Sequence, residues 1–297
     1  MTESEQTLEN NLIEQLVREG YTFAKNVVDE ESLIENFREK LEIFNHTELS
    51  DAEFAQIRNF LMTGDVFDRA KKLRDAFTLK NREDNQPDQN IRFLDQQDFS
   101  RNIFQVAHQI VIDREAGARY DNRYDVDILI NGLPLVHIEL KRRDGEIQEA
   151  FNQVNRYNHD SFGAGDGFFR FVQLFVISNG VDTKYFANSL AGNEHSNSFD
   201  FTSFWTDRDN SRISELGDFA KTFLRPEFLA KFITKYMVLT TDKKLMALRP
   251  YQFYAAEAIA AKVREYDETR PDYRGGYVWH TTGSGKTLTS FTAATLI

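Results

Sequence analysis

The sequence predicts an α/β protein in which a central mixed sheet is flanked by helices. Three observations predict it. Apolar residues recur at helical spacing through most of residues 1–80. Two apolar, β-branched runs then flank Asn131-Gly132, a pair suited to the tight turn of a hairpin. A further helical pattern and further buried strands follow the hairpin, and this order favours one sheet with helices packed on it.

The first eighty residues are expected to be mostly helical. We predict a helix over residues 7–19, with Thr7 as its capping residue. From residue 29 to residue 77 apolar residues again recur three and four apart, and Ser50 begins the second helix of this stretch. Residues 81–90 are polar and predict an exposed loop.

Further along, apolar runs predict the remaining strands of the sheet. Residues 103–112 alternate as a strand that leads into the hairpin, and residues 171–177 and 184–188 read as neighbouring strands. Residues 191–215 are polar and rich in Ser and Asn, with four aromatic residues embedded, so we expect a surface excursion packed by its aromatics. Residues 216–236 are expected to be helical and to close the domain.

The composition limits the functions that the chain can perform alone. Its 297 residues hold 36 basic and 47 acidic side chains, a net charge of −11, which is the wrong sign for coating nucleic acid non-specifically. Any such contact is therefore a local patch or comes from a partner. The absence of cysteine excludes disulfides and thiol catalysis. No apolar run reaches membrane-spanning length, and we expect a cytoplasmic protein.

Charged residues interrupt the apolar pattern of the hairpin. Glu139 and Lys141 are two residues apart on the second strand, so their side chains point to one face. Asp125 and Asp127 share a face of the first strand for the same reason. Whether the two faces coincide depends on the pairing register of the strands.

The register in turn depends on the loop. With a two-residue loop and regular pairing, Asp125 falls on the far side from Glu139. One extra residue instead places Asp125 opposite Glu139, and Asp127 opposite His137. We therefore expect a three-residue loop or a bulge, with Gly132 in the left-handed conformation.

Two carboxylates and a lysine on one small area have three interpretations. In the first interpretation they form a salt-bridge cluster on a solvated face, although the flanking residues are apolar. In the second they perform general acid–base catalysis, as paired carboxylates do in glycosidases, although nothing nearby resembles a sugar cleft. Alternatively, they bind a divalent metal for phosphodiester hydrolysis, because carboxylate oxygens suit Mg²⁺ and the lysine can orient water and offset developing charge.

The residues of this hairpin resemble a known nuclease motif. Asp125 followed by Glu139-Leu140-Lys141 resembles the PD-(D/E)xK motif, and residues 131–136, Asn-Gly-Leu-Pro-Leu-Val, are similar to HsdR, the restriction and motor subunit of type I restriction-modification enzymes. The resemblance implies a PD-(D/E)xK nuclease core in which Asp125, Glu139 and Lys141 are catalytic. It also implies that Asp125, Glu139 and the backbone carbonyl of Leu140 bind Mg²⁺, and that no acid is required at Asp127.

Two helices are expected to contribute to this site. Residues 146–158 form an amphipathic pattern on which Gln153 and Tyr157 lie side by side, and they match the QxxxY motif that follows the nuclease lysine in HsdR. Related nucleases also place a glutamate on their first helix that can touch the metal. Glu9 is the matching residue, and an ordinary acid on a solvated helix face is the alternative. For His108, a packed or hydrogen-bonded role is expected rather than metal binding.

A second functional stretch lies near the end of the sequence. Residues 276–279 read as a strand that enters His280-Thr-Thr-Gly-Ser-Gly-Lys-Thr287, and a helix follows. In such a loop the backbone N–H groups face phosphates, while the lysine reaches the β and γ oxygens and the threonine ligates Mg²⁺. His280 replaces the usual first glycine. The loop resembles motif I of superfamily 2 helicases, and Gln252 matches their adenine-reading glutamine. The residues expected to bind ATP are Gln252, Gly283, Ser284, Gly285, Lys286 and Thr287.

Together these features predict two units and a set of partners. We place an endonuclease domain at residues 1–240 and the truncated start of a RecA-like ATPase and translocase at residues 241–297. No Walker B acids and no second motor lobe follow Thr287, so we expect no ATP hydrolysis by this fragment of a longer subunit. The resemblance implies DNA as substrate, and methyltransferase and specificity subunits as partners. A rival interpretation is a non-cleaving DNA-binding module on a helicase; a stand-alone repair nuclease fits the ATP-binding motif less well.

Overall fold

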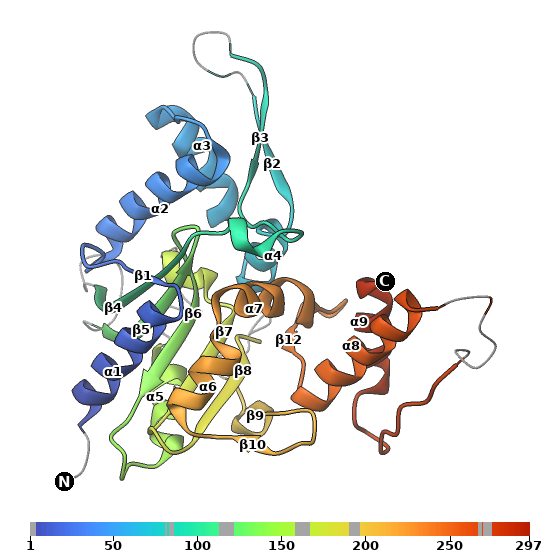
Figure 1. Cartoon of the computed structure of the whole chain (residues 1–297). Helices are drawn as coiled ribbons and strands as arrows, with labels where there is room; N and C mark the ends of the chain where they lie inside the picture. The colour runs from blue at the N-terminus through green and yellow to red at the C-terminus, as the bar shows by residue number, and fades with distance from the viewer. Residues whose placement is uncertain are drawn as a thin grey trace.

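The computed structural model confirms an α/β protein with a central mixed sheet (Figure 1). It describes residues 4–80, 82, 86–112, 122–157, 167–189, 197–266, 269 and 275–297. Within these residues, eight strands form the main sheet, in the order β1-β4-β5-β6-β7-β8-β9-β10. β1 pairs with β4, and β6 with β7, in parallel, while the other neighbours are antiparallel.

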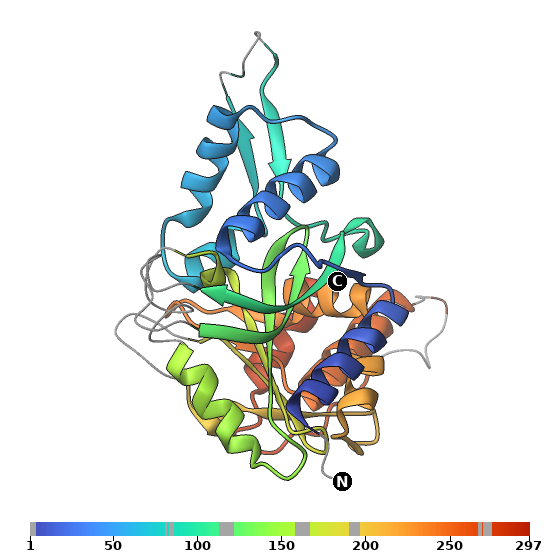
Figure 2. The ribbon, with the colours of Figure 1, turned by 90° about the vertical axis from the view of Figure 1, so that its left-hand side faces the viewer.

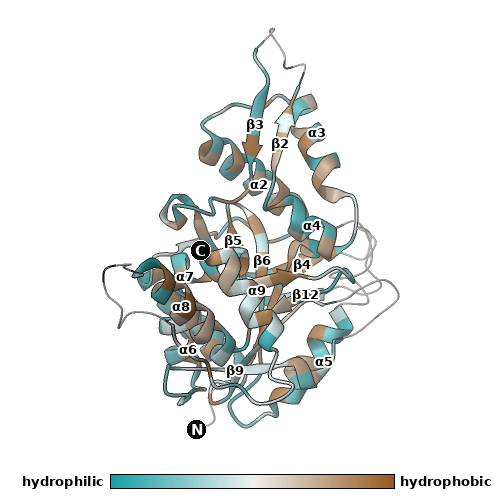
Figure 3. Ribbon diagram, turned by 90° about the vertical axis from the view of Figure 1, so that its right-hand side faces the viewer, coloured by the Kyte–Doolittle hydropathy of each residue, from teal (hydrophilic) through white to brown (hydrophobic). Residues whose placement is uncertain are grey.

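The strands of the main sheet are β1 (Thr22–Phe23), β4 (Phe104–Ile112), β5 (Asn122–Ile130), β6 (Leu133–Leu140), β7 (Leu174–Ser178), β8 (Thr183–Ala187), β9 (Ser203–Thr206) and β10 (Arg212–Ile213). Every residue of β6 is buried, because this strand lies in the middle of the sheet and is covered on both faces. The hydrophobic colours in Figure 3 accordingly gather in the central strands. The strands predicted before the hairpin and after it are confirmed.

Helices cover both faces of the sheet (Figure 2). On one side lie α1 (Glu5–Arg18) and α6 (Leu216–Phe223), which contact each other, and on the other lies α5 (Ile147–Tyr157). α7 (Pro226–Lys231) and a π-helical turn, η7 (Phe232–Tyr236), follow α6, as the predicted helical stretch requires. Short 3-10 turns, η2 (Phe99–Arg101), η5 (Phe168–Phe171) and η6 (Phe199–Phe201), join the strands.

The predicted cap of the first helix is wrong. α1 begins at Glu5, and the Ser4 hydroxyl accepts a hydrogen bond from the backbone N–H of Thr7 at 3.2 Å. Ser4 has the extended backbone that a capping residue needs, so Thr7 already lies in the first turn. For the third helix the prediction is confirmed, because Ser50 and Glu53 form a reciprocal capping box.

A small unit adjoins one end of the main sheet and extends to the top of Figure 1. It contains α2 (Glu30–Asn45), α3 (Asp51–Met62), α4 (Val66–Lys72) and a hairpin of β2 (Ala76–Leu79) and β3 (Gln89–Arg92). The predicted loop over 81–90 largely connects these strands; residues 81 and 83–85 of it lie outside the described residues. Helical spacing therefore identified α2 and α3. α4 falls within the stretch predicted to be helical but was not separated from α3, and β2 begins at Ala76, also within that stretch.

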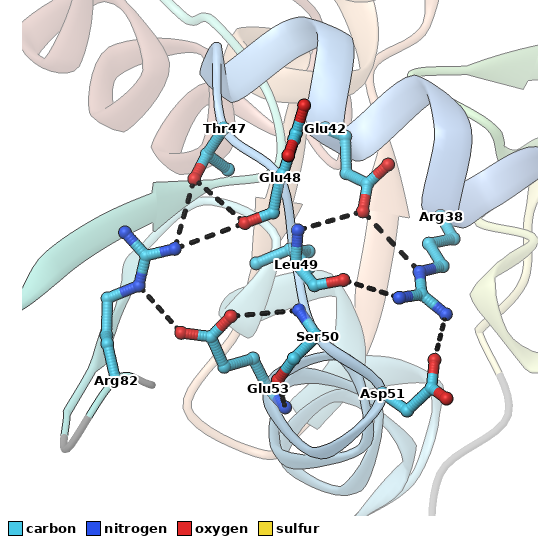
Figure 4. Close-up of polar contacts among 9 residues, drawn as sticks. All are labelled: Arg38, Glu42, Thr47, Glu48, Leu49, Ser50, Asp51, Glu53 and Arg82. Carbon is cyan, nitrogen blue, oxygen red and sulfur yellow. Dashed lines mark hydrogen bonds and ion pairs between the residues drawn. The ribbon is translucent and has the colours of Figure 1, made fainter. Parts of the chain in front are cut away.

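One arginine holds the hairpin against the α2–α3 corner (Figure 4). The Arg82 guanidinium donates to Glu53 Oε1 at 2.8 Å, and both side chains are nearly buried. It also donates to the Glu48 carbonyl at 3.1 Å and to the Thr47 hydroxyl at 3.3 Å. Because Glu53 is also the N3 residue of α3, a single carboxylate connects the helix cap to the hairpin.

The predicted surface excursion over residues 191–215 is wrong for its second half. β9 and β10 extend the main sheet there, and residues 190–196 lie outside the described residues. Trp205 of β9 is 2% exposed and packs against Tyr185, Phe223 and Phe253. Burial of this large ring stabilises a strand where the surrounding polar residues indicated a loop.

The remaining elements lead to the glycine-rich loop. They are β11 (Met237–Leu239), β12 (Leu245–Ala247), α8 (Pro250–Arg264) and α9 (Lys286–Leu296). The strand predicted over 276–279 is wrong. The segment is irregular, and its Tyr277 and Trp279 side chains are 90% and 88% exposed. A strand needs a neighbour for its backbone groups, and none of the described residues pairs with this segment.

The β11–β12 hairpin spans the predicted domain boundary at residue 240, and that boundary remains a prediction. Among the residues described here, no helix combines the length and the apolar character needed to cross a membrane.

Candidate functional site

The turn of the β5–β6 hairpin is fixed from both sides. Asn131 and Gly132 both have positive φ, 51° and 81°, which is the type I′ geometry of a two-residue turn, and the left-handed Gly132 is confirmed. The Asn131 side chain accepts from the Ile103 N–H at 2.7 Å and donates to the Phe93 carbonyl at 2.8 Å. A Cβ on Gly132 would lie 2.6 Å from Phe37 Cα, so only glycine fits against α2.

A bulge follows the turn and sets the register. Leu129 pairs with Pro134 and Ile128 pairs with Val136, which leaves Leu135 as an extra residue in β6. The predicted bulge is thus confirmed, combined with a two-residue loop. As a result Asp127 lies opposite His137, as expected with one extra residue.

Asp125 consequently reaches the end of β6. The pairing of β5 with β6 runs only as far as Val126 and Ile138, and beyond it the Asp125 carboxylate accepts the backbone N–H of Leu140 at 2.8 Å. Lys141 Nζ donates to Glu139 Oε1 and to the Leu140 carbonyl, both at 3.0 Å. The structure therefore brings together Asp125, Glu139, Lys141 and the Leu140 carbonyl.

This cluster is buried and holds more than one negative charge. Glu139 is fully buried, and the side chain of Lys141 is 12% exposed. Burial, and next the charge of Glu139, raise the pKa of Asp125 to about 7, although the Leu140 N–H and Lys141 act in the opposite direction. Two neighbouring carboxyl groups in a buried place favour the arrival of a cation, which offsets their mutual repulsion.

The donor set fits a hard divalent cation. Two carboxylates and a backbone carbonyl offer only oxygen, which Mg²⁺ prefers over nitrogen or sulfur. The Lys141 ammonium already bridges Glu139 Oε1 and the Leu140 carbonyl, so a positive charge sits on two of the expected ligand oxygens. Within the described ranges no group of three or more acidic or histidine side chains forms a metal cluster, and the expected ligands include only two side chains.

A buried histidine lies behind Glu139. His137 is fully buried, and its Nδ1 lies 2.9 Å from Asp127 Oδ1 while its Nε2 lies 3.2 Å from Glu139 Oε2. Burial alone lowers the pKa of His137, but the charge of Asp127 and the hydrogen bonds to both carboxylates outweigh it and raise the pKa to about 9. The register expectation placed Asp127 opposite His137, but not the contact of His137 with Glu139.

The QxxxY pair lies beside the hairpin. Gln153 Nε2 donates to the Tyr157 hydroxyl at 2.6 Å, and that hydroxyl donates to the Arg123 carbonyl at 3.2 Å. Tyr157 is 3% exposed. Burial, and next the charge of Glu139, raise the pKa of Tyr157, so its hydroxyl keeps its proton.

Glu9 is near the site but already hydrogen-bonded. Its Oε1 lies 2.7 Å from His108 Nδ1, and its Oε2 accepts from Gln109 at 3.1 Å. The hydrogen-bonded role predicted for His108 is confirmed, and metal binding by Glu9 remains a prediction. Sequence reasoning missed Gln109, whose φ of 53° is left-handed in the middle of β4. Its polar side chain in an apolar run was the available signal.

The glycine-rich loop and α8 meet as the motif order predicts. Gln252 Nε2 donates to the Ser284 carbonyl at 2.9 Å, as does the Tyr251 hydroxyl at 3.0 Å. Gly285 has a φ of 77°, and a Cβ there would lie 2.3 Å from Gln252 Nε2. Lys286 begins α9 and donates to the Thr281 carbonyl at 3.0 Å.

A cavity of about 960 Å³ adjoins this loop. The residues expected to bind ATP that line it are Gln252, Gly283, Ser284, Gly285 and Thr287. Residues of β8, β11 and β12 line its other walls. Five of the six residues expected to bind nucleotide thus border one space.

Comparisons with known proteins identify the family of the chain. Residues 2–194 match the family model described as type I restriction enzyme R protein N terminus, and residues 251–297 match the SWI2/SNF2 ATPase model. The SsaAORF53P endonuclease subunit of Staphylococcus saprophyticus is 42% identical over 99% of this chain and 30% of its own length. The EcoprrI endonuclease subunit of Escherichia coli is 38% identical over 93% of this chain and 88% of its own length. A putative subunit of Methanocaldococcus jannaschii, MjaVIIIP, is 25% identical over 71% of this chain.

A mixed sheet with an acid, an acid and a lysine on adjacent strands is consistent with an α/β nuclease core. The chain belongs to the family of type I restriction enzyme R proteins, of which it represents the N-terminal part. It spans about 30% of the length of the staphylococcal relatives that it matches.

We expect Gly132→Ala to destabilise the fold by about 3 kcal/mol, because a Cβ meets the α2 backbone in addition to the strain of a left-handed φ. Gly275→Ala is the matched control. Its φ is 78° and nothing lies within 4 Å of the added Cβ, so only the strain of about 1 kcal/mol remains. Urea unfolding measures both, and equal losses would contradict the close packing of the turn on α2.

We expect Asp125→Asn to stabilise the metal-free protein at high pH. The folded pKa of about 7 lies above the ordinary value of 3.8, so between these pH values the folded state binds more protons than the unfolded state. The free energy of unfolding therefore falls as pH rises through this window. Asparagine keeps an acceptor for the Leu140 N–H but has no charge. In EDTA, its melting temperature should exceed that of the wild type by a few degrees at pH 8 and converge with it near pH 4. Parallel curves for the two proteins would contradict the raised pKa.

Proposed function

We propose that this chain carries the DNA-cutting centre of a type I restriction enzyme and the beginning of its ATP-driven motor. The reaction is Mg²⁺-dependent hydrolysis of DNA phosphodiester bonds. One observation carries the proposal: the bulge at Leu135 lets Asp125 meet the main chain of β6 where Glu139, Lys141 and the Leu140 carbonyl converge. Family membership supports it, because relatives with up to 42% identity are named endonuclease subunits.

Asp125, Glu139 and the Leu140 carbonyl would hold the cation. The chemistry that a bound Mg²⁺ would supply is polarisation of the scissile phosphate and activation of the attacking water. Lys141 then leaves its present acceptors and donates hydrogen bonds to the attacking water or to a phosphate oxygen, where its charge offsets the negative charge that develops. Lys141 lies only two residues beyond Glu139, so its ammonium remains close to the expected ligands after it leaves these acceptors.

α5 supports the reacting strand and offers donors to the DNA backbone. Tyr157 anchors the helix to β5 through the Arg123 carbonyl, and its raised pKa keeps the hydroxyl a donor. Gln153, one turn earlier, is expected to reach a phosphate oxygen once its bond to Tyr157 is exchanged.

ATP is the ligand we assign to the glycine-rich loop. Backbone N–H groups of Gly283 to Gly285 at the N-terminus of α9 favour phosphate, Lys286 reaches the outer phosphates, and Thr287 ligates Mg²⁺. Gln252 holds the loop and reads the adenine. Hydrolysis requires in addition an acid that positions Mg²⁺ and water and an arginine that stabilises the transition state, both supplied from elsewhere in the motor.

Sequence recognition is assigned to partners. A net charge of −11 opposes non-specific attraction to DNA, and the relatives are each named as one subunit of an enzyme. We infer that methyltransferase and specificity subunits bind the target site and that translocation by the complete motor delivers DNA to the cutting centre.

We expect Asp125→Ala and Lys141→Ala to lower DNA cleavage by the complete enzyme at least 100-fold, because each removes a group that acts on the reacting phosphate. Cleavage of circular plasmid with Mg²⁺ and ATP measures this, while ATP hydrolysis and DNA methylation should stay at wild-type rates.

Asp144→Ala is the matched control, because Asp144 lies three residues beyond Lys141 but is exposed and pairs with Arg142. It should cut like the wild type. Cleavage within threefold of wild type by both site variants would place cutting elsewhere and leave this domain as a DNA-binding module.

A further inference from the structure

A buried pair of side chains stands directly behind the proposed metal ligand. Asp127 and His137 face each other across β5 and β6, both fully buried, with 2.9 Å between Oδ1 and Nδ1. The other ring nitrogen, Nε2, lies 3.2 Å from Glu139 Oε2. His137 thus connects a carboxylate with no assigned role to a carboxylate in the cutting centre.

The direction of the hydrogen bonds follows from the partners. Asp127 and His137 share one proton, which resides either on the imidazole or on the carboxyl group. In both cases Nε2 carries a hydrogen and donates it to Glu139, because a carboxylate at Glu139 can only accept. In both cases the pair is neutral overall, so it adds no net charge to the site.

Because of this donor, the two carboxylate oxygens of Glu139 have different partners. Oε2 is held by His137, and Oε1 points to Lys141, whose ammonium also contacts the Leu140 carbonyl. The last torsion of a glutamate is otherwise broad, so without His137 the carboxylate can turn. Aromatic rings fix the imidazole in turn: Tyr124, Tyr157 and Phe175 lie 5.4, 6.1 and 6.3 Å from it, between ring centroids.

Stability alone does not explain the pair. Asp127 Oδ2 is buried without a hydrogen-bond partner in the part of the chain that the structure describes. Burying a charged pair with one oxygen unsatisfied costs free energy, and an apolar cross-strand pair would be at least as stable. Rigid support of a metal ligand is a role that an apolar pair cannot perform.

We propose that His137, oriented by Asp127, is a positioning residue that fixes Glu139 for binding the divalent cation. The inference rests on the proposed function, because it assigns Glu139 to the metal. It adds Asp127 and His137 to the residues that the cutting centre needs, beside the two acids and the lysine. This neutral pair on two adjacent strands supports Glu139.

The test is the affinity of the full chain for Mn²⁺, measured by calorimetry without DNA or nucleotide. Asp127→Val/His137→Leu removes the donor to Glu139 without changing the net charge. Because both members of the buried pair are replaced together, neither is left without the other, so the variant should fold. We expect its Mn²⁺ affinity to fall at least tenfold. Asp127→Asn/His137→Gln is also neutral but offers an amide N–H to Glu139, and it should recover affinity to within about threefold of wild type.

Phe175→Leu is the matched control. Phe175 pairs with His137 across β6 and β7 and gives Glu139 no hydrogen bond. Its replacement by leucine loosens the same part of the core as the Val/Leu variant. It should lower the melting temperature and leave the Mn²⁺ affinity unchanged. A loss of affinity in Phe175→Leu as large as in the Val/Leu variant would overturn the inference, since packing alone would then explain both.

Asp125→Ala separates this inference from the proposed function. One outcome is that the wild type binds Mn²⁺, that Asp125→Ala does not, and that the Val/Leu variant binds as tightly as the wild type. In that case the positioning role is refuted and the metal site stands. If the wild type binds no Mn²⁺, or Asp125→Ala binds it equally well, the metal site fails and the positioning role fails with it.

Discussion

The pairing register of β5 and β6 is the constraint on which the candidate site depends. Side chains alternate between the two faces of a strand, so one residue more or less in β6 decides whether Asp125 meets Glu139 or lies on the other side of the sheet. The bulge at Leu135 supplies that residue. Two contacts hold the turn before it: the buried side chain of Asn131 and the approach of Gly132 to the backbone of α2. The small α2–α3 unit thereby helps to set the chemistry of the sheet.

Electrostatics in the site then follow from where the register puts the charges. Glu139 and Asp127 are fully buried in the centre of the sheet, where an isolated carboxylate would be costly. His137 and Lys141 each bring a donor to Glu139 from opposite sides. Burial, and next the neighbouring charge of Glu139, raise the pKa of Asp125 to about 7, although the one backbone N–H that it accepts acts in the opposite direction. The site is therefore poised to gain a cation near Asp125, at the accessible end of the cluster.

Local patterns were sufficient to predict most of this arrangement. Alternation identified β4, apolar runs identified most of β5 to β8, helical spacing identified α1, α2, α3 and α5, and the two-residue period placed Glu139 and Lys141 on one face. The choice between a longer loop and a bulge was not predictable, because both give the same register beyond Val136. Non-local pairing explains two errors: β9 forms because Trp205 finds an aromatic pocket, and residues 276–279 stay irregular because none of the described residues pairs with them. The polar side chain of Gln109 interrupts the apolar run of β4, but it does not specify the left-handed φ that the residue adopts.

The central claim is that Asp125, Glu139 and the Leu140 carbonyl form one cation site because the bulge aligns them. Crystals of the chain soaked in Mn²⁺ test it most directly, since anomalous scattering locates the ion independently of any activity. The account predicts a single strong peak within about 2.5 Å of an oxygen of each of these three groups, with Lys141 displaced from the Leu140 carbonyl, and no such peak in Asp125→Ala. A wild-type crystal with no peak there, or with Mn²⁺ bound to Asp125 while Glu139 stays paired with Lys141 and His137 alone, would contradict it.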